Sequence, residues 1–319
     1  MGIAVGLGLA NYPFAETDAF WDWVRLCEEG GVDSIWQTDR LVSGEPILEC
    51  ITAMAALAGA TKRIKFGMNV VSVGMRDPLL LAKQLATVDV LSKGRVLPAF
   101  GIGSIRAPEW KVTGIGTEAR GARTDEGLEI IARLWQGEKL NYDGRFYQYD
   151  GVRIAPIPVQ KRIPMWIGGS TRHAIRRTAK YGTGWQAALE TPAQAGETVR
   201  AIMAMTGEFG RSIDDDHFGA AFTFRYGRPE DEIVEKAKKR LRFVAGEKPI
   251  DHALVVGDSA AIAAQVQAFV DHGLSKFILR PLGTDDADML AQTRRMIDEV
   301  LPEVAAMNAR QKAAQASAA

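Results

Sequence analysis

The sequence has few cysteines and no excess of charge of either sign. Only Cys27 and Cys50 occur among 319 residues, and their positions match no metal-binding or redox spacing. We therefore expect both thiols to be reduced and packed inside a cytoplasmic protein. Lysine and arginine total 39, as do aspartate and glutamate. No overall field therefore favours nucleic acid or an anionic membrane surface as a partner.

Long apolar runs and clustered metal ligands are also lacking. No segment approaches the roughly 20 apolar residues that a transmembrane helix requires, and the chain leads directly into a predicted strand without a signal peptide. We therefore expect a soluble protein with no membrane partner. The four histidines are scattered, and neither an HExxH nor a GxSxG pattern occurs. These absences disfavour a metal site, a metal-dependent hydrolase and a serine hydrolase.

Apolar segments rich in β-branched residues alternate with amphipathic helical segments along most of the chain. Helical patterns cover residues 18–29, 46–60, 78–91, 119–135, 172–181, 192–206, 229–244, 259–272 and 286–300. Strands are predicted at residues 3–9, 34–37, 64–73, 95–101, 165–168, 184–187, 217–224 and 276–279. Eight alternating units predict an α/β protein whose parallel strands close into a TIM (β/α)8 barrel.

Two segments depart from this alternation. Residues 135–164, after strand four, contain a predicted hairpin with an Asp143-Gly144 turn, and an additional helix is expected between strands seven and eight. No Ser/Gly-rich linker divides the chain, so we predict one barrel domain over residues 1–306 with insertions after strands four and seven. Residues 307–319 are small and polar, and we expect a disordered tail there.

A doubly wound dinucleotide-binding fold is the alternative architecture. Gly6 and Gly8 follow the first strand as in a dinucleotide-binding motif, but Asn11 stands where the third glycine belongs. Pro13 follows at once, and no helix opens directly on the motif. The barrel is therefore the favoured prediction.

Polar residues at the carboxyl ends of the predicted strands are candidates for an active site, because barrel enzymes build their sites there. Asp39 and Arg40 follow strand two; they could form a structural ion pair, or Arg40 could stabilise an oxygen that gains charge. Glu109, beside Trp110 in the loop after strand four, could act as an acid or close the site. Other polar residues at strand ends are Asn11, Asn69, Arg225 and Arg280.

Two glycine-rich segments also lie at strand ends. Residues 101–104 read GIGS, and their lack of side chains lets a ligand approach the backbone closely. Residues 168–171 read GGST and open a helix whose free backbone N–H groups could bind a phosphate. In the alternative interpretation, Ser170 or Thr171 only caps that helix.

A series of short motifs, in their order and spacing, resembles the luciferase-like monooxygenase superfamily of flavin- and deazaflavin-dependent barrel oxidoreductases. The resemblance extends over nearly the whole chain. The motifs are DSIWQTDR (33–40), AALA (55–58) with TKRI (61–64), RDP (76–78) with AKQLAT (82–87), LSKGR (91–95), GIG (101–103), RGARTDE (120–126), YDGRFY (142–147), PMWIGG (164–169) and GTGW (182–185).

The resemblance implies a homodimeric barrel that holds the tricyclic ring of coenzyme F420 or FMN at the strand ends. In the deazaflavin branch, a non-prolyl cis peptide in strand three backs the ring, and the matching bond here is Asn69–Val70. This role would also explain a polar Asn69 within an apolar strand. The residues that the resemblance assigns to the cofactor are Asn69, Val70, Gly101, Gly103, Ser104, Gly168, Gly169, Ser170, Thr171 and Trp185.

One departure from the family leaves the substrate open. The sugar-phosphate dehydrogenases of the deazaflavin branch use a histidine as base where this chain has Arg40, so that role is not transferred. We predict hydride transfer to or from a small organic substrate, or its monooxygenation, with Asp39, Arg40 and Glu109 as catalytic residues. An FMN enzyme would add a separate flavin reductase as a partner. The alternative function is a non-catalytic flavin-binding barrel.

Overall fold

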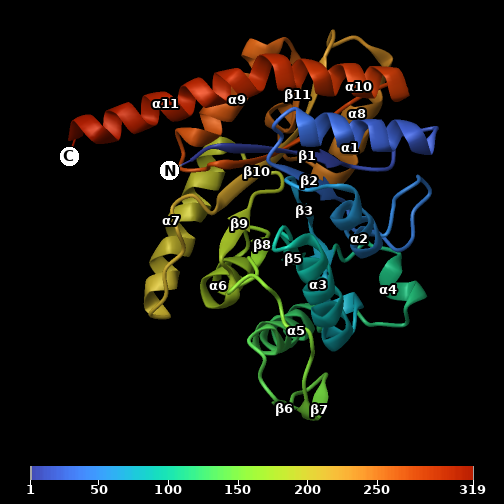
Figure 1. Cartoon of the computed structure of the whole chain (residues 1–319), viewed down its shortest axis with the longest axis vertical. Coiled ribbons are helices and arrows are strands. Elements are labelled where there is room, and N and C mark those ends of the chain that lie inside the picture. Colours follow the sequence, from blue (N-terminus) through green and yellow to red (C-terminus); the bar gives the residue numbers. More distant parts are fainter. Residues whose placement is uncertain (1, 319) are drawn as a thin grey trace.

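Parallel strands surround a common axis, and helices cover them from outside (Figure 1). This arrangement is seen in a computed structural model that describes residues 2–318. The predicted nearly closed barrel is therefore confirmed, in the strand order β3-β2-β1-β12-β10-β9-β8-β5-β4. These strands are β1 (Ala4–Leu9), β2 (Ser34–Gln37), β3 (Lys65–Met68), β4 (Val71–Ser72), β5 (Ala99–Gly101), β8 (Trp166–Gly168), β9 (Gly184–Gln186), β10 (Phe218–Tyr226) and β12 (Lys276–Pro281).

The predicted third strand is divided into two short strands. β3 pairs with β2, whereas β4 pairs with β5 on the other side. The break lies at Asn69–Val70, whose peptide bond is cis. Below the break, Phe66 N donates to Arg95 O at 3.0 Å and Leu97 N donates to Phe66 O at 2.8 Å, which closes the ring of strands.

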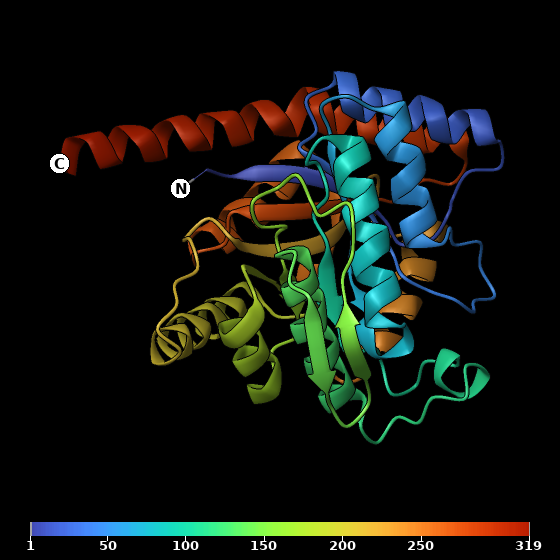
Figure 2. The ribbon, with the colours of Figure 1, turned by 60° about the horizontal axis from the view of Figure 1, so that its bottom comes forward.

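All the predicted helices are present, with small differences at their ends. Figure 2 shows α2 and α3 side by side on the outside of the strands. Among residues 2–318, no helix combines the length and apolarity needed to cross a membrane. The helices are α1 (Thr17–Glu29), α2 (Cys50–Ala60), α3 (Pro78–Ser92), α4 (Glu109–Val112), α5 (Arg120–Trp135), α6 (Arg172–Tyr181), α7 (Pro192–Glu208), α8 (Glu232–Ala245), α9 (Ser259–Val270), α10 (Asp286–Arg295) and α11 (Leu301–Ala318).

Local sequence signals set the ends of α3, which follows the divided strand. The Asp77 carboxylate accepts a hydrogen bond from Leu80 N at 2.9 Å, and Pro78 occupies the first turn, where its missing N–H costs nothing. Lys93 in the left-handed conformation and Gly94 with φ of 85° end the helix. The polypeptide then returns to the barrel as β5.

Three segments differ from the sequence-based expectation. β11 (Leu254–Gly257) pairs in parallel with β10 outside the ring and was not predicted. The hairpin of β6 (Leu140–Asp143) and β7 (Gln148–Val152) is present, but residues 144–147 form a longer turn than Asp-Gly alone. Residues 301–318 are helical, where the sequence predicted a disordered tail from 307. The domain boundary at 306 stays a prediction.

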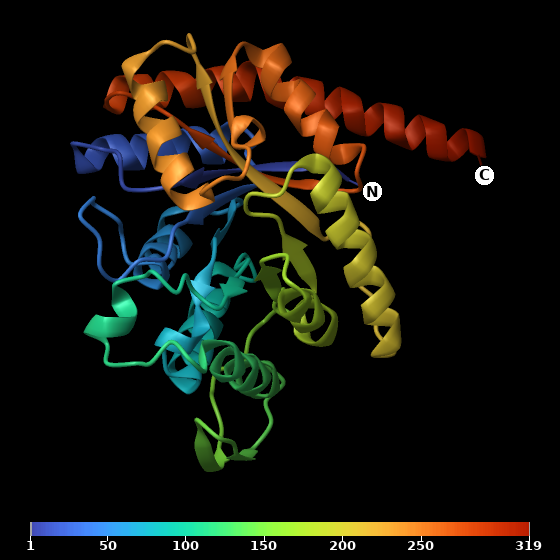
Figure 3. The ribbon, with the colours of Figure 1, turned by 180° about the vertical axis from the view of Figure 1, so that it is seen from behind.

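The helix α11 is attached to the first strand by a side chain. Asn308 accepts from Ile3 N at 2.7 Å and donates to Ile3 O at 2.9 Å. Val304 and Met307 are buried against the core. Seen from behind, the helix continues past the N-terminus and leaves the body of the molecule (Figure 3). Its first half is therefore part of the packed structure despite its polar composition.

The interior of the barrel is built from two tryptophans and small residues. Trp36 and Trp166 form one buried cluster with Ala99, Ala221 and Ile278. A Cβ atom at Gly184 would lie 2.9 Å from the Trp166 ring, and one at Gly67 would lie 2.9 Å from the Trp36 ring. Glycines on neighbouring strands therefore make room for the two indoles, in place of the branched side chains usual in such barrels. Cys27 and Cys50 lie on helices outside the ring of strands; both are buried, and neither forms a disulfide.

We expect Gly184→Ala to destabilise the protein by about 1–3 kcal/mol, because the added methyl would overlap the Trp166 ring and the neighbouring backbone. The Cβ atom would lie 2.7 Å from His217 O, and this backbone oxygen cannot rotate away. The control is Gly44→Ala, where nothing lies within 4 Å of the added atom. Urea denaturation of both variants measures the difference. Equal unfolding midpoints for the two variants would contradict this account of the interior.

Candidate functional site

A cavity of about 190 Å³ opens at the carboxyl ends of β2, β4 and β5. The three residues predicted to be catalytic, Asp39, Arg40 and Glu109, all line it. Four of the residues assigned to a cofactor line it as well: Asn69, Val70, Gly103 and Ser104. Side chains from three separate segments therefore meet at the end of the barrel where the sequence placed the site.

Arg40 and Glu109 form an ion pair in the wall of this cavity. Arg40 Nη1 lies 3.5 Å from Glu109 Oε1, with 40% of the Arg40 side chain exposed but only 3% of Glu109. Glu109 Oε2 is buried and has no hydrogen-bond partner in the described part of the chain. Trp110 Nε1 donates to Ser104 O at 2.8 Å and holds the short helix α4 against the loop. The carboxylate therefore has a nearby cation and one oxygen available to a ligand.

Asp39 has a different partner from the neighbour that the sequence suggested. Its two oxygens accept from Arg76 Nη1 at 2.9 Å and Nη2 at 2.7 Å, and Oδ2 also accepts from Ser72 N at 3.0 Å. Burial opposes the charge of Arg76, but the attraction of Asp39 prevails and raises the Arg76 pKa. Both oxygens of Asp39 are thus committed to joining the end of β2 to β4. This geometry favours a positioning role for Asp39 over the expected catalytic one.

Asn69 and Val70 shape the floor of the cavity. Asn69 N donates to Gln37 O at 2.9 Å, whereas its side-chain Nδ2 is buried without a partner among residues 2–318. A Cβ atom at Gly101 would lie 2.6 Å from Val70 Cγ2, and one at Gly168 would lie 3.2 Å from Val70 Cγ1. These two glycines therefore make room for Val70. The interpretation that Gly101 admits a ligand to its backbone is replaced by this packing.

The GGST segment lies outside the cavity wall, and its hydroxyl groups are already bonded. Thr171 Oγ1 accepts from Ala174 N at 3.3 Å and so caps α6. Ser170 Oγ donates to Glu190, whose other oxygen accepts from Ala188 N at 2.7 Å. A phosphate here would therefore depend on the backbone N–H groups of Gly169 to Thr171, and this assignment stays a prediction.

Trp185, which the resemblance assigned to the cofactor, does not line the cavity. Its side chain is fully buried, and Nε1 donates to Gly169 O at 2.7 Å. The indole therefore supports the glycine turn from within the core and does not line the cavity. We correct its assignment to a residue that positions Gly169.

Arg280 is the unpaired cation of this end of the barrel. It follows Ile278 by two residues on β12, so both side chains point to the barrel interior. In the described chain it has neither an ion pair nor a hydrogen bond, and burial, with a smaller contribution from Arg240, lowers its pKa to about 10. It remains charged at neutral pH. Arg225, by contrast, pairs with Asp288 at 2.7 Å and is structural.

Two groups of possible metal ligands occur among residues 2–318. Asp39, Glu49 and Cys50 form one, but the Arg76 guanidinium bonds both carboxylates and takes the place of a cation. Asp214, Asp216 and His217 form the other, at the opposite end of the barrel. Neither group lines the cavity with an open set of ligands.

The residues present fit the ring of a flavin or deazaflavin. Such rings carry carbonyl oxygens along one edge, and the cavity offers Asn69 Nδ2, which has no acceptor in the described chain, and the partly exposed guanidinium of Arg40, whose Nη1 lies beside Glu109. Val70 provides an apolar surface beside these donors. The fit of the phosphate is less complete because Glu190 already holds Ser170.

The family model described as luciferase-like monooxygenase matches residues 5–267. The chain belongs to this family. The cis bond at Asn69–Val70, which the resemblance implied, agrees with this membership. Members related to this chain use coenzyme F420 or FMN, and the family consists of oxidoreductases.

The relatives of this chain include a dehydrogenase, and the similar solved structures include a monooxygenase and a second dehydrogenase. The chain is 26% identical over 340 residues to an F420-dependent glucose-6-phosphate dehydrogenase of Amycolatopsis mediterranei (strain U-32), covering 96% of this chain and 99% of the relative. A monooxygenase of Streptomyces bottropensis has a similar structure, with a TM-score of 0.81 and 18% identity over 94% and 99% of the two chains. An F420-dependent secondary alcohol dehydrogenase in complex with an F420–acetone adduct gives the same TM-score and identity, over 95% and 99%.

We expect Asp39→Asn to lower the free energy of unfolding by about 2–4 kcal/mol, because it leaves the buried Arg76 charge without its bidentate partner. Only 4% of the Asp39 side chain and 12% of the Arg76 side chain are exposed. Asp33→Asn is the matched control, since it removes a partly exposed pair with Lys65 on the same barrel. Chemical denaturation measures both. If Asp39→Asn lowers the free energy of unfolding less than Asp33→Asn does, the Asp39–Arg76 ion pair does not have this stabilising role.

Proposed function

We propose that this luciferase-like protein binds coenzyme F420 at the carboxyl end of the barrel and transfers a hydride to or from a small organic substrate. The observation that carries the proposal is the Arg40–Glu109 pair, which faces Asn69 and Val70 across one cavity. The similarity over almost the full chain to a relative named as an F420-dependent dehydrogenase supports this choice.

The ring of the cofactor, when bound, supplies the two-electron chemistry. The protein would bind the ring against Val70, with Asn69 Nδ2 donating to a carbonyl oxygen. The oxidation of an alcohol also removes a proton from the substrate oxygen, and the reduction of a carbonyl adds one; Glu109, whose Oε2 has no hydrogen-bond partner in the described chain, would accept or donate it. Arg40 would stabilise the Glu109 carboxylate and the substrate oxygen when either carries negative charge.

Arg280 indicates which charge the ligand should carry. This cation has no carboxylate partner in the described chain and lies inside the barrel near its carboxyl end. It would therefore favour an anionic group on the substrate or on the cofactor tail. No such preference would come from Arg225 or Arg76, whose charges are already neutralised by Asp288 and Asp39. The homodimer, the cytoplasmic location and, for an FMN enzyme, the separate flavin reductase stay predictions.

Titration of the protein with coenzyme F420 and with FMN, read by ring fluorescence, tests the cofactor. We expect F420 to bind at least about tenfold more tightly than FMN, a difference of about 1.4 kcal/mol. Tighter binding of FMN would instead indicate a monooxygenase. Binding of neither cofactor below about 1 mM, or about −4.1 kcal/mol, would overturn the site itself.

We expect Glu109→Gln to lower kcat by about 10²–10⁴-fold, because the amide cannot exchange the proton, while F420 affinity changes little. Glu118→Gln is the control, since Glu118 is an exposed carboxylate in the same loop region. Absorbance of the ring measures turnover over a panel of alcohols, aldehydes and sugar phosphates. Tight F420 binding with no turnover by the unmodified protein across the panel would favour the non-catalytic alternative. Turnover unchanged in Glu109→Gln would remove Glu109 from the mechanism.

A further inference from the structure

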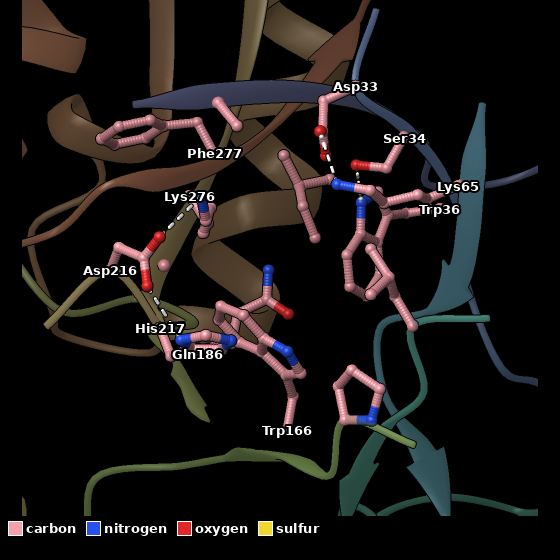
Figure 4. A pocket seen from close by; sticks show the side chains of 15 residues that line it. Asp33, Ser34, Trp36, Lys65, Trp166, Gln186, Asp216, His217, Lys276 and Phe277 are labelled. Carbon is pink, nitrogen blue, oxygen red and sulfur yellow. Dashed lines mark hydrogen bonds and ion pairs between the residues drawn. The ribbon is translucent and has the colours of Figure 1, made fainter. Parts of the chain in front are cut away.

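A second cavity, of about 240 Å³, opens at the amino ends of the barrel strands. Ala4, Lys65 and Lys276, the first residues of β1, β3 and β12, lie on its wall, so it is at the opposite end of the barrel from Arg40 and Glu109. Its inner part is formed by Trp36, Trp166, Gln186 and Ile278, and charged residues stand around its mouth (Figure 4).

Three buried polar atoms on the wall of this amino-end cavity lack a hydrogen-bond partner in the described chain, and one of them, His217 Nδ1, lies 3.0 Å from Asp216 Oδ1. Trp166 Nε1 and Gln186 Oε1 have no hydrogen-bond partner among residues 2–318, although the residues are only 6% and 4% exposed. Figure 4 shows both side chains at the inner end of the cavity. Trp36 differs, because its Nε1 donates to Ser34 Oγ at 2.9 Å. An unmade buried hydrogen bond is costly, so one donor and one acceptor here are prepared for an occupant.

Aromatic surfaces flank these two groups. The Trp166 ring is held flat against the backbone by Gly184 and Gly219, whose Cβ atoms would lie 2.9 and 3.2 Å from it. The His217 ring lies with its centroid 6.0 Å from Trp166, tilted by 38°. Trp36 closes the other side of the same cluster. Such walls favour a flat ring over a flexible chain.

The charges at the mouth neutralise one another. Lys65 Nζ lies 3.0 Å from Asp33, and Lys276 Nζ lies 3.6 Å from Asp216. The other oxygen of Asp216 lies 3.0 Å from His217 Nδ1. Unlike Arg280 at the carboxyl end, neither lysine is left without a carboxylate. The mouth therefore favours an uncharged occupant over an anion or a cation.

We propose that the amino-end cavity binds a neutral, planar lactam-type heterocycle. In such a ring an N–H and a C=O group are adjacent, so the C=O can accept from Trp166 Nε1 while the N–H donates to Gln186 Oε1. The indole N–H and the amide oxygen are thus satisfied together, and the flat ring packs against the aromatic side chains of the cavity wall. This site does not depend on the identity of the cofactor at the other end.

The experiment uses the full chain with 15N-labelled tryptophan and follows its seven indole N–H signals by NMR. The probe is 2-pyridone, and Trp166→Phe identifies the Trp166 signal. We expect a saturable shift of Trp166 and little change at Trp110, which reports on the carboxyl-end cavity through its bond to Ser104. N-methyl-2-pyridone, which lacks the donor, should bind at least about fivefold more weakly because Gln186 stays unpaired.

Gln186→Leu provides the second variant, since it keeps the approximate volume and removes the acceptor. It should weaken 2-pyridone to the level of the N-methyl probe, and the remaining indole signals show whether the variant is folded. An unchanged Trp166 signal at the highest probe concentration would mean that water alone fills the cavity, and the proposal fails. Equal binding of both probes, or a shift confined to Trp110, would also overturn it. None of these outcomes bears on F420 binding.

Discussion

The break of the third strand at Asn69–Val70 is the constraint on which the carboxyl end of the barrel depends. It lets β3 pair with β2 while β4 pairs with β5, so the ring of strands closes around an interruption. Val70 then projects over Gly101 and Gly168, where a Cβ atom would lie 2.6 and 3.2 Å from its methyl groups. Asp39 fixes the far side of the break through Ser72 N and Arg76. The floor and one wall of the cavity therefore follow from a single local distortion.

The two ends of the barrel are prepared for different ligands by the way their charges are paired. At the carboxyl end, Arg280 has no counter-ion and one oxygen of Glu109 has no donor. At the amino end, Lys65 and Lys276 have carboxylate partners, and the buried atoms without a hydrogen-bond partner in the described chain are Trp166 Nε1, Gln186 Oε1 and His217 Nδ1, which lies beside Asp216. An unpaired charge attracts a charged or reacting group, whereas an unpaired neutral donor and acceptor select shape and hydrogen-bond pattern.

The periodicity of the sequence was sufficient to predict the barrel, its eight main strands and the end at which the cavity opens. It could not identify partners distant in sequence. Asp39 has a basic neighbour in Arg40, but its ion pair is with Arg76, 37 positions away. Gly101 was interpreted as space for a ligand and Gly168 as part of a phosphate site, because nothing in the sequence indicates where Val70 points. The short strand β11 and the helical tail were missed for a related reason, since pairing with β10 and the contacts of Asn308 are tertiary.

Arg40 determines how a proton could move in this site. An arginine side chain is not a general base, so Arg40 does not provide the base that a histidine would provide at this position. The exchange of a proton must then fall to Glu109, the one ionisable carboxylate in the cavity wall of the described chain whose oxygens are not both bonded. At 3.5 Å, Arg40 is near enough to stabilise the ionised carboxylate but leaves Oε2 free. In the proposed mechanism, Arg40 would stabilise the negative charge and Glu109 would exchange the proton, so the two residues would divide the roles that a single histidine combines.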